Sequence, residues 1–204
     1  MEKNRLEAFS DGVLAIIITI MVLELHVPQP TEQTPRPDQF AALKPLLPIF
    51  LTYALSFIYI GIYWNNHHHL LKAARRVTAA MMWANLHLLF WLSLFPFVTG
   101  WMGENHFTTG PTALYGAVML LAAIAYYILQ NVIVAEQGRD SKLAASIGRD
   151  LKGKVSPILY ATAIGAAFFR PWISCALYVL VALVWLVPDR RIERVLDEVK
   201  PPAH

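Results

Sequence analysis

The chain has 204 residues, of which 56% are hydrophobic and only 15% are charged, and its formal net charge is +3 at pH 7. Soluble globular domains are about 45–50% apolar and about 25% charged, so this composition excludes an ordinary soluble domain and favours a protein of the lipid bilayer. The small net charge argues against a nucleic-acid-binding surface. The single cysteine, Cys175, excludes an intramolecular disulfide framework.

Six apolar stretches are long enough, or nearly long enough, to cross about 30 Å of hydrocarbon as helices. Their approximate bounds are 4–27, 43–66, 77–100, 111–135, 155–169 and 172–187. The first stretch lacks a small-residue cleavage site after its apolar core, which favours a retained helix over a signal peptide. We find no internal repeat. The chain is therefore predicted to be one all-α, polytopic membrane domain of six transmembrane helices.

Arg170-Pro171 separates the last two stretches. In one continuous helix Arg170 would lie deep in the bilayer, at a cost of about 2.5–3.5 kcal/mol, and Pro171 would remove a backbone hydrogen bond. We therefore predict a tight hairpin between two short helices. If both termini are cytoplasmic, 14 of the 17 Lys and Arg residues lie on the cytoplasmic side, and only Arg36, Lys44 and Arg170 lie outside. This asymmetry is what the positive-inside rule requires.

Ser10 and Asp11 precede the apolar run of the first stretch, and two interpretations of them stay open. Either residue type can cap a helix, in which case the helix begins near Asp11. Residues 2–8, however, are good helix formers. A helix that begins near Glu2 would place both polar side chains at the inner edge of the hydrocarbon, where a carboxylate needs partners. The candidate partners on the second and third stretches are Trp64, His67, His68, Asn85 and His87.

The pattern Arg5-x-x-x-Phe9-Ser10-Asp11 at the head of an apolar first helix resembles the signature of the transmembrane protein 175 family. This family comprises endosomal and lysosomal potassium channels and their bacterial relatives. Four further features are also similar to the family: the segment from Gly61 to His69, the Arg75-Arg76-Val77 turn, Asn85, and Leu94-Phe95-Pro96-Phe97. The last three predicted helices match in hydrophobicity only. The signature and its supporting polar network would comprise Arg5, Phe9, Ser10, Asp11, Trp64, His67, His68 and Asn85.

The resemblance implies a potassium-permeable cation channel that conducts passively in the plasma membrane. A chain with one six-helix repeat implies a homotetramer, in which four copies of the first helix line a central pore with an apolar constriction. The pore-facing apolar positions fall on Ile16, Ile20 and Leu23, and the polar position linked to selectivity falls on Thr19. Another position, sometimes serine in the family, is Ala15 here, which weakens the expected potassium preference. From the residues alone, the same apolar stripe is typical of ordinary helix packing.

Two other classes of function stay open. Asp11 and the histidines of the second stretch could relay protons in a proton-coupled transporter or a proton-leak pathway. A membrane enzyme or assembly factor would instead use the histidines as metal ligands. His67, His68 and His69 are consecutive and would point in different directions from a helix, so we expect no metal site. The sequence has no phosphate-binding loop and no serine-nucleophile motif, and we therefore expect neither catalysis nor a cofactor.

Overall fold

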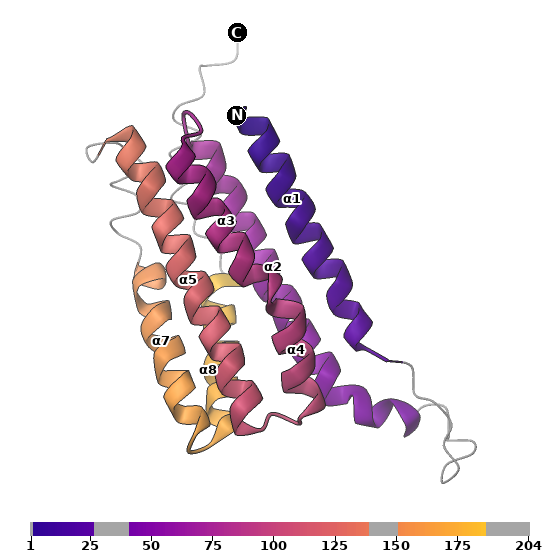
Figure 1. Ribbon diagram of the computed structural model, residues 1–204. Coiled ribbons are helices and arrows are strands. Elements are labelled where there is room, and N and C mark those ends of the chain that lie inside the picture. The colour runs from indigo at the N-terminus through magenta and orange to yellow at the C-terminus, as the bar shows by residue number, and fades with distance from the viewer. Residues whose placement is uncertain (1, 27–40, 139–150, 187–204) are drawn as a thin grey trace.

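The computed structural model describes residues 2–26, 41–138 and 151–186, and over these ranges all of the regular secondary structure is helical. Helices run side by side along one bundle axis (Figure 1). The first, α1 (Lys3–Ile20), continues into a 3-10 turn, η1 (Met21–Glu24), and a second 3-10 segment, η2 (Ala41–Leu46), leads into α2 (Leu47–Ala73). The remaining helices are α3 (Ala79–Ser93), α4 (Phe95–Glu104), α5 (Thr109–Gln137), α7 (Leu151–Ala167) and α8 (Pro171–Leu186).

Helix α1 begins at Lys3, preceded by Glu2 in an extended conformation that makes no side-chain cap hydrogen bond. Ser10 and Asp11 are therefore inside the helix, and their interpretation as an N-terminal cap is wrong. The stretch from Glu2 to Ala8 contains no helix breaker, so the helix propagates through it without a cap at Asp11. The alternative prediction, a helix that starts near Glu2, is confirmed.

The third predicted stretch, 77–100, is not one helix. Thr78 caps α3 by accepting a hydrogen bond from the Met81 amide at 3.2 Å, and the helix ends at Ser93 before α4 begins at Phe95. Pro96 occupies the first turn of α4. Proline has no amide hydrogen, so within one continuous helix a backbone hydrogen bond would be lost. In the first turn of a helix no such bond is needed, and proline is tolerated there. The second stretch was predicted too short at its end, because α2 continues through the three histidines to Ala73.

The hairpin predicted at Arg170-Pro171 is confirmed. Helix α7 ends at Ala167 and α8 begins at Pro171. The Arg170 amide donates to the Ala166 carbonyl at 2.8 Å, and the Ile173 amide donates to the Arg170 carbonyl at 2.9 Å. Proline suits the first position of α8, where its fixed φ matches the helix and no amide hydrogen is needed.

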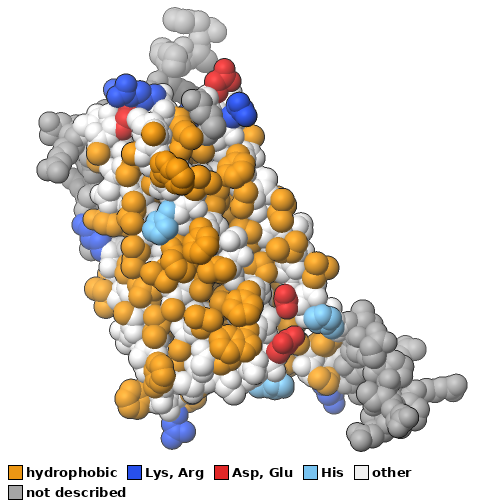
Figure 2. All heavy atoms as spheres, in the orientation of Figure 1, with side chains coloured by type: hydrophobic (Ala, Val, Ile, Leu, Met, Phe, Trp, Pro, Cys, Tyr) orange, Lys and Arg blue, Asp and Glu red, His pale blue; other side chains and the backbone are white. Residues whose placement is uncertain are grey.

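Four segments of the described chain are long and apolar enough to cross a membrane, by length and composition: Lys3–Glu24, Leu43–Ala73, Ala79–Glu104 and Thr109–Gln137. Helix α8 is apolar but shorter, and α7 and α8 pack together as the hairpin pair. Apolar side chains cover the middle of the face shown in Figure 2, and charged side chains gather nearer the two ends. Val27 and Val187, the last residues of two predicted spans, lie outside the described residues.

Helix α1 lies at one edge of the bundle and the α7–α8 pair lies at the other, with α5 between α3 and α7 (Figure 1). Helix α1 contacts α2, α3 and α4. The core is continuous, and its largest fully buried side chains include Tyr59, Tyr115, Tyr178 and Phe95. The placement of α1 at the edge leaves one of its faces without a partner in the described chain.

Candidate functional site

Helix α1 has two distinct faces. Its inner face consists of Leu6, Ser10, Leu14, Ile17 and Met21, which are all at most 3% exposed. These residues follow one another at spacings of three and four, so they form one row along the helix. Because this row packs into the bundle, the rotation of α1 about its own axis is fixed.

The opposite face carries the four positions that the sequence analysis assigned to a constriction. We call Ile16, Thr19, Ile20 and Leu23 the outer stripe. Leu23 is 69% exposed, Ile16 is 60% exposed and Ile20 is 40% exposed, and Thr19 is exposed as well. The outer stripe is therefore an apolar surface that no other described part of this chain covers.

Thr19 is the polar member of the outer stripe. Its hydroxyl donates within the helix, with the Ala15 carbonyl at 2.9 Å and the Ile16 carbonyl at 3.0 Å. One hydroxyl has a single proton and two acceptor lone pairs. The proton is therefore used inside the helix, and the oxygen keeps acceptor capacity toward the exposed side. Such an oxygen can contact a cation, whereas the alanine at position 15 offers no polar atom beside it.

A buried chain of polar side chains joins α1 to α3 and α2. The amide nitrogen of Asn85 donates to Ser10 Oγ at 2.9 Å, and Ser10 Oγ donates to the Leu6 carbonyl at 2.9 Å. The amide oxygen of Asn85 pairs with His67 Nε2 at 2.7 Å. Since that oxygen can only accept, His67 Nε2 must carry a proton. Ser10 and Asn85 are fully buried and His67 is 1% exposed, so the chain is shielded from solvent within the subunit.

Asp11 belongs to a separate pair. Its carboxylate accepts a hydrogen bond from Trp64 Nε1 at 3.0 Å, and Trp64 stacks on the ring of His68 with centroids 6.3 Å apart. The predicted polar network is thus divided in two, with Ser10, Asn85 and His67 in one part and Asp11, Trp64 and His68 in the other. Arg5 is exposed and Phe9 is 50% exposed, so neither packs into the buried chain. His87 hydrogen-bonds Trp91 instead, at 2.9 Å.

Contacts that no sequence motif predicted occur at the end of the bundle where α1 begins. Lys3 Nζ donates to the carbonyls of Lys72 at 2.7 Å and Ala74 at 3.0 Å. Arg76, just after that turn, forms a salt bridge with Glu136 at the end of α5, at 2.7 Å. The last carbonyls of any helix lack partners within it, and this was the one available signal that a nearby lysine would bind them. The contacts tie the start of α1 to the α2–α3 turn and to α5.

The three consecutive histidines are held differently from one another. His67 is buried against Asn85, whereas His68 and His69 are half-buried and contact each other edge to face, with centroids 5.8 Å apart. Over the described residues, no group of three or more His, Cys, Asp or Glu side chains is placed to hold a metal ion.

Comparison with known proteins identifies the family. The sequence model of the endosomal/lysosomal potassium channel TMEM175 matches residues 5–96. A potassium channel of Chryseobacterium sp. (strain P1-3) is 54% identical over 198 residues, which cover 97% of this chain and all of that protein. The chain belongs to the TMEM175 family. The matched residues run from Arg5 to Pro96 and thus contain α1 except its first two residues, the buried polar chain and the Asp11–Trp64 pair.

Two other TMEM175 relatives support the assignment, one over most of the chain and one over a shorter part of it. The crystal structure of a lysosomal potassium-selective channel TMEM175 homologue from Chamaesiphon minutus superposes with a TM-score of 0.80 at 28% identity, and covers 91% of this chain and 97% of that one. The human endosomal/lysosomal proton channel TMEM175 is 41% identical over 86 residues, which is 40% of this chain and 17% of the human protein. The family is thus one of ion channels, and it is not a family of enzymes.

Proposed function

We propose that this protein is a potassium-permeable cation channel that conducts ions passively through a central pore lined by α1 from four identical subunits. We place it in the plasma membrane with both termini in the cytoplasm. The observation that carries the proposal is the outer stripe of α1, an apolar surface left uncovered on a helix whose opposite face is buried. Relatives named as potassium channels match nearly the whole chain, which supports the same function.

The constriction in this proposal is a set of apolar rings. Ile16, Ile20 and Leu23 project on one side of α1, and four copies around an axis would narrow the pore at three levels. Apolar constrictions can gate by loss of water from the pore. A cation crossing them loses part of its hydration shell, which costs less for potassium than for sodium. Thr19 adds one ring of hydroxyl oxygens between the apolar rings, and this favours cations over anions.

The buried polar chain has a positioning role in the proposed channel. A helix turns about 100° per residue, so a small rotation of α1 would move the outer stripe off the pore axis. The contacts from Ser10 through Asn85 to His67 fix α1 against α3 and α2 at one height. The Lys3 contacts fix it again at its start. The pore-facing side chains would thus be held from the opposite face of their own helix.

Proton permeation is the second candidate, because the human relative is named a proton channel. A relay from Asp11 to the histidines of α2 is less well supported. The hydrogen bond described for the Asp11 carboxylate comes from Trp64, and the one described for His67 Nε2 goes to Asn85. The two groups therefore lie in separate hydrogen-bonded sets, and we favour passage through the pore for either ion.

Ion flux from liposomes that contain the purified protein tests the proposal. We expect potassium to move down its own gradient, faster than sodium and without an imposed proton gradient. Strict dependence on a proton gradient would refute the channel and favour a carrier. A pH-sensitive dye in the same liposomes measures the proton flux, and native mass spectrometry measures the number of subunits.

Two isoleucines of similar exposure allow a matched test of the pore assignment. Ile16 is 60% exposed on α1 and Ile158 is 65% exposed on α7, so Ile16→Asn and Ile158→Asn add the same polar group to comparable surfaces. We expect Ile16→Asn to change the potassium-to-sodium flux ratio or the conductance severalfold, and Ile158→Asn to leave both unchanged. Equal effects of the two substitutions, with tetramers intact, would show that α1 does not line the pore.

A further inference from the structure

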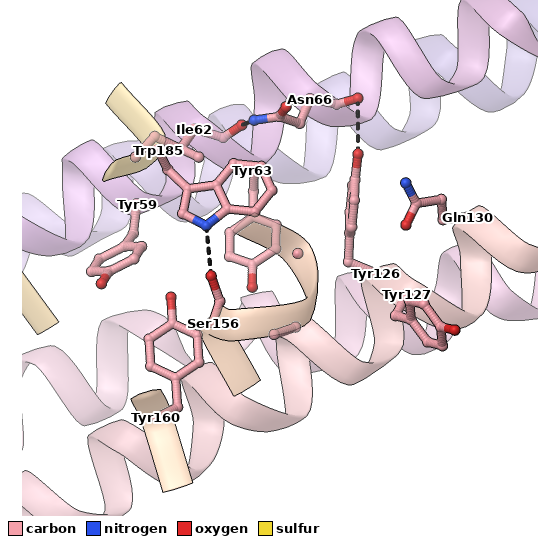
Figure 3. Close-up of a pocket in the computed structure, with 12 residues that line it drawn as sticks. Tyr59, Ile62, Tyr63, Asn66, Tyr126, Tyr127, Gln130, Ser156, Tyr160 and Trp185 are labelled. Atoms are coloured by element: carbon pink, nitrogen blue, oxygen red, sulfur yellow. Dashed lines mark hydrogen bonds between the residues drawn. The ribbon is translucent and has the colours of Figure 1, made fainter. Parts of the chain in front are cut away.

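The bundle contains a cavity of about 40 Å³ on the side away from α1, between α2, α5, α7 and α8. Its walls are mainly aromatic, with Tyr59 and Tyr63 from α2, Tyr126 from α5, Tyr160 from α7 and Trp185 from α8. Figure 3 shows the hydroxyls of Tyr63, Tyr160 and Ser156 turned toward a common space, whereas that of Tyr127 points away from it. The cavity is thus an aromatic box with polar groups directed inward.

Two of these polar groups lack a partner among the described residues. Gln130 is only 5% exposed, and its side-chain amide, which lines the cavity, makes no hydrogen bond within the described ranges. The hydroxyl of Tyr63 is in the same situation. Ser156 and Trp185 are paired, since Ser156 Oγ accepts from Trp185 Nε1 at 2.8 Å and donates to the Lys152 carbonyl at 2.7 Å. Neither group is among the fully buried polar atoms that lack a partner, so both are accessible from the cavity, and an occupant that carries a hydroxyl group can hydrogen-bond to them.

An open groove of about 320 Å³ adjoins the cavity on the outside of the bundle. Ile62, Asn66 and Trp185 line both spaces, so the two share a wall. Phe57, Ile58 and Leu186 make the groove largely apolar. Its volume lies within the range of about 300–1,000 Å³ that is typical of small-molecule sites. The groove follows α2, a helix long and apolar enough to span the membrane.

We propose that cavity and groove together bind a neutral amphiphile, with a hydroxyl-bearing head group in the cavity and an apolar chain in the groove. The head group would bond Tyr63 and Gln130, and the chain would lie against Phe57, Ile58 and Leu186. No Lys, Arg, Asp or Glu is among the described residues that line either space. A head group with ionised parts, zwitterionic ones included, would therefore be desolvated without compensation from these residues, and this selects a monoacylglycerol or a long-chain alcohol over a phospholipid such as phosphatidylcholine.

Fluorescence quenching by brominated lipids tests this assignment, because bromine quenches a tryptophan that it touches. The full-length tetramer is placed in phosphatidylcholine vesicles and titrated with a monoacylglycerol brominated in mid-chain. The signal of Trp185 is the difference between the unmodified protein and Trp185→Phe. We expect saturable quenching of this difference signal. In Gln130→Leu and Tyr63→Phe the half-maximal concentration should rise about tenfold, as expected for the loss of one hydrogen bond to a buried group.

Tyr127→Phe is the matched control, because Tyr127 lines the same cavity with its hydroxyl turned away, and we expect it to bind like the unmodified protein. Tetramer size by gel filtration verifies that each variant folds. Equal quenching by a phosphatidylcholine brominated at the same position would assign the groove to bulk lipid and overturn the proposal. Absence of saturable quenching would also overturn it, because the cavity would then hold only water or another part of the chain. Neither result bears on the pore, which liposome flux measures separately.

Discussion

Asn85→Ala should destabilise the folded protein more than any single substitution on its surface. Asn85 is fully buried and joins three helices through two hydrogen bonds, one to Ser10 of α1 and one to His67 of α2. Alanine removes both bonds. The two former partners remain buried, and they lose their hydrogen bonds to different extents.

The expected loss follows from what each partner keeps. His67 is 1% exposed, and its Nε2–H would have no acceptor after the substitution, which costs about 1–3 kcal/mol. Ser10 still donates to the Leu6 carbonyl, so it loses only an incoming bond worth about 0.5–1.5 kcal/mol. Together these give roughly 1.5–4.5 kcal/mol. Hydrogen bonds between membrane helices average about 0.6 kcal/mol in double-mutant cycles, and this sets a lower bound near 1 kcal/mol.

Unfolding in mixed micelles with increasing sodium dodecyl sulfate, followed by circular dichroism, measures the free energy of unfolding. Asn131→Ala is the matched control, because Asn131 is exposed and donates only to the Tyr127 carbonyl on its own helix, at 2.7 Å. We expect this control to stay within about 0.5 kcal/mol of the unmodified protein. If the two alanine variants unfold at the same detergent fraction, the buried polar chain does not stabilise α1 and the positioning argument fails.

Two further predictions use the same unfolding measurement. Gly103→Ala should lower the free energy of unfolding by about 1–3 kcal/mol, since the new Cβ would lie 2.6 Å from the Ile49 Cα on α2. Gly165→Ala is the control, because Gly165 has open space around it, and it should be neutral or stabilising by up to about 1 kcal/mol. Equal effects of the two substitutions would refute the close approach of α4 to α2. Arg76→Ala should cost about 1–3 kcal/mol, because Arg76 is 76% exposed but Glu136 is only 12% exposed and would lose this partner. The loss should be smaller at high salt, and a loss below about 0.5 kcal/mol would contradict this.

Much of the helical framework could be predicted because it depends on local patterns. Residues 2–8 lack a breaker, and α1 does begin at Lys3. Arg170-Pro171 is costly inside a membrane helix, and a hairpin forms there. The division between α3 and α4 had a local signal as well, because Pro96 cannot donate the backbone bond that a continuous helix needs. The third stretch, 77–100, was nevertheless predicted as one helix, because apolar composition alone does not distinguish one helix from two in series.

The pairing of polar side chains could not be predicted in the same way. The sequence placed Asp11, Trp64, His67 and Asn85 at a similar depth, but depth does not determine which atoms meet. That depends on the rotation of each helix about its axis, which is set by packing of the whole inner face. Helix α1 turns Ser10 toward Asn85 and brings neighbouring Asp11 to Trp64. Ser10 and Asp11 are neighbours in the sequence, yet Ser10 belongs to the buried polar chain and Asp11 belongs to the separate pair with Trp64.

Exposed apolar surface occurs at both edges of the bundle, and its composition differs between them. The tip of the α7–α8 hairpin exposes Phe168, Phe169 and Trp172, at 69%, 84% and 69%. Large aromatic side chains of this kind suit the interface between membrane and water. Helix α1 instead exposes Gly12 and Ala15 beside the outer stripe, and small residues allow two membrane helices to approach closely. Gly12 lies in line with Thr19 and Leu23, at helical spacings of seven and eleven, so small and protruding residues alternate along one face of α1. In the proposed channel, this face suits a helix that packs against its own copies around an axis.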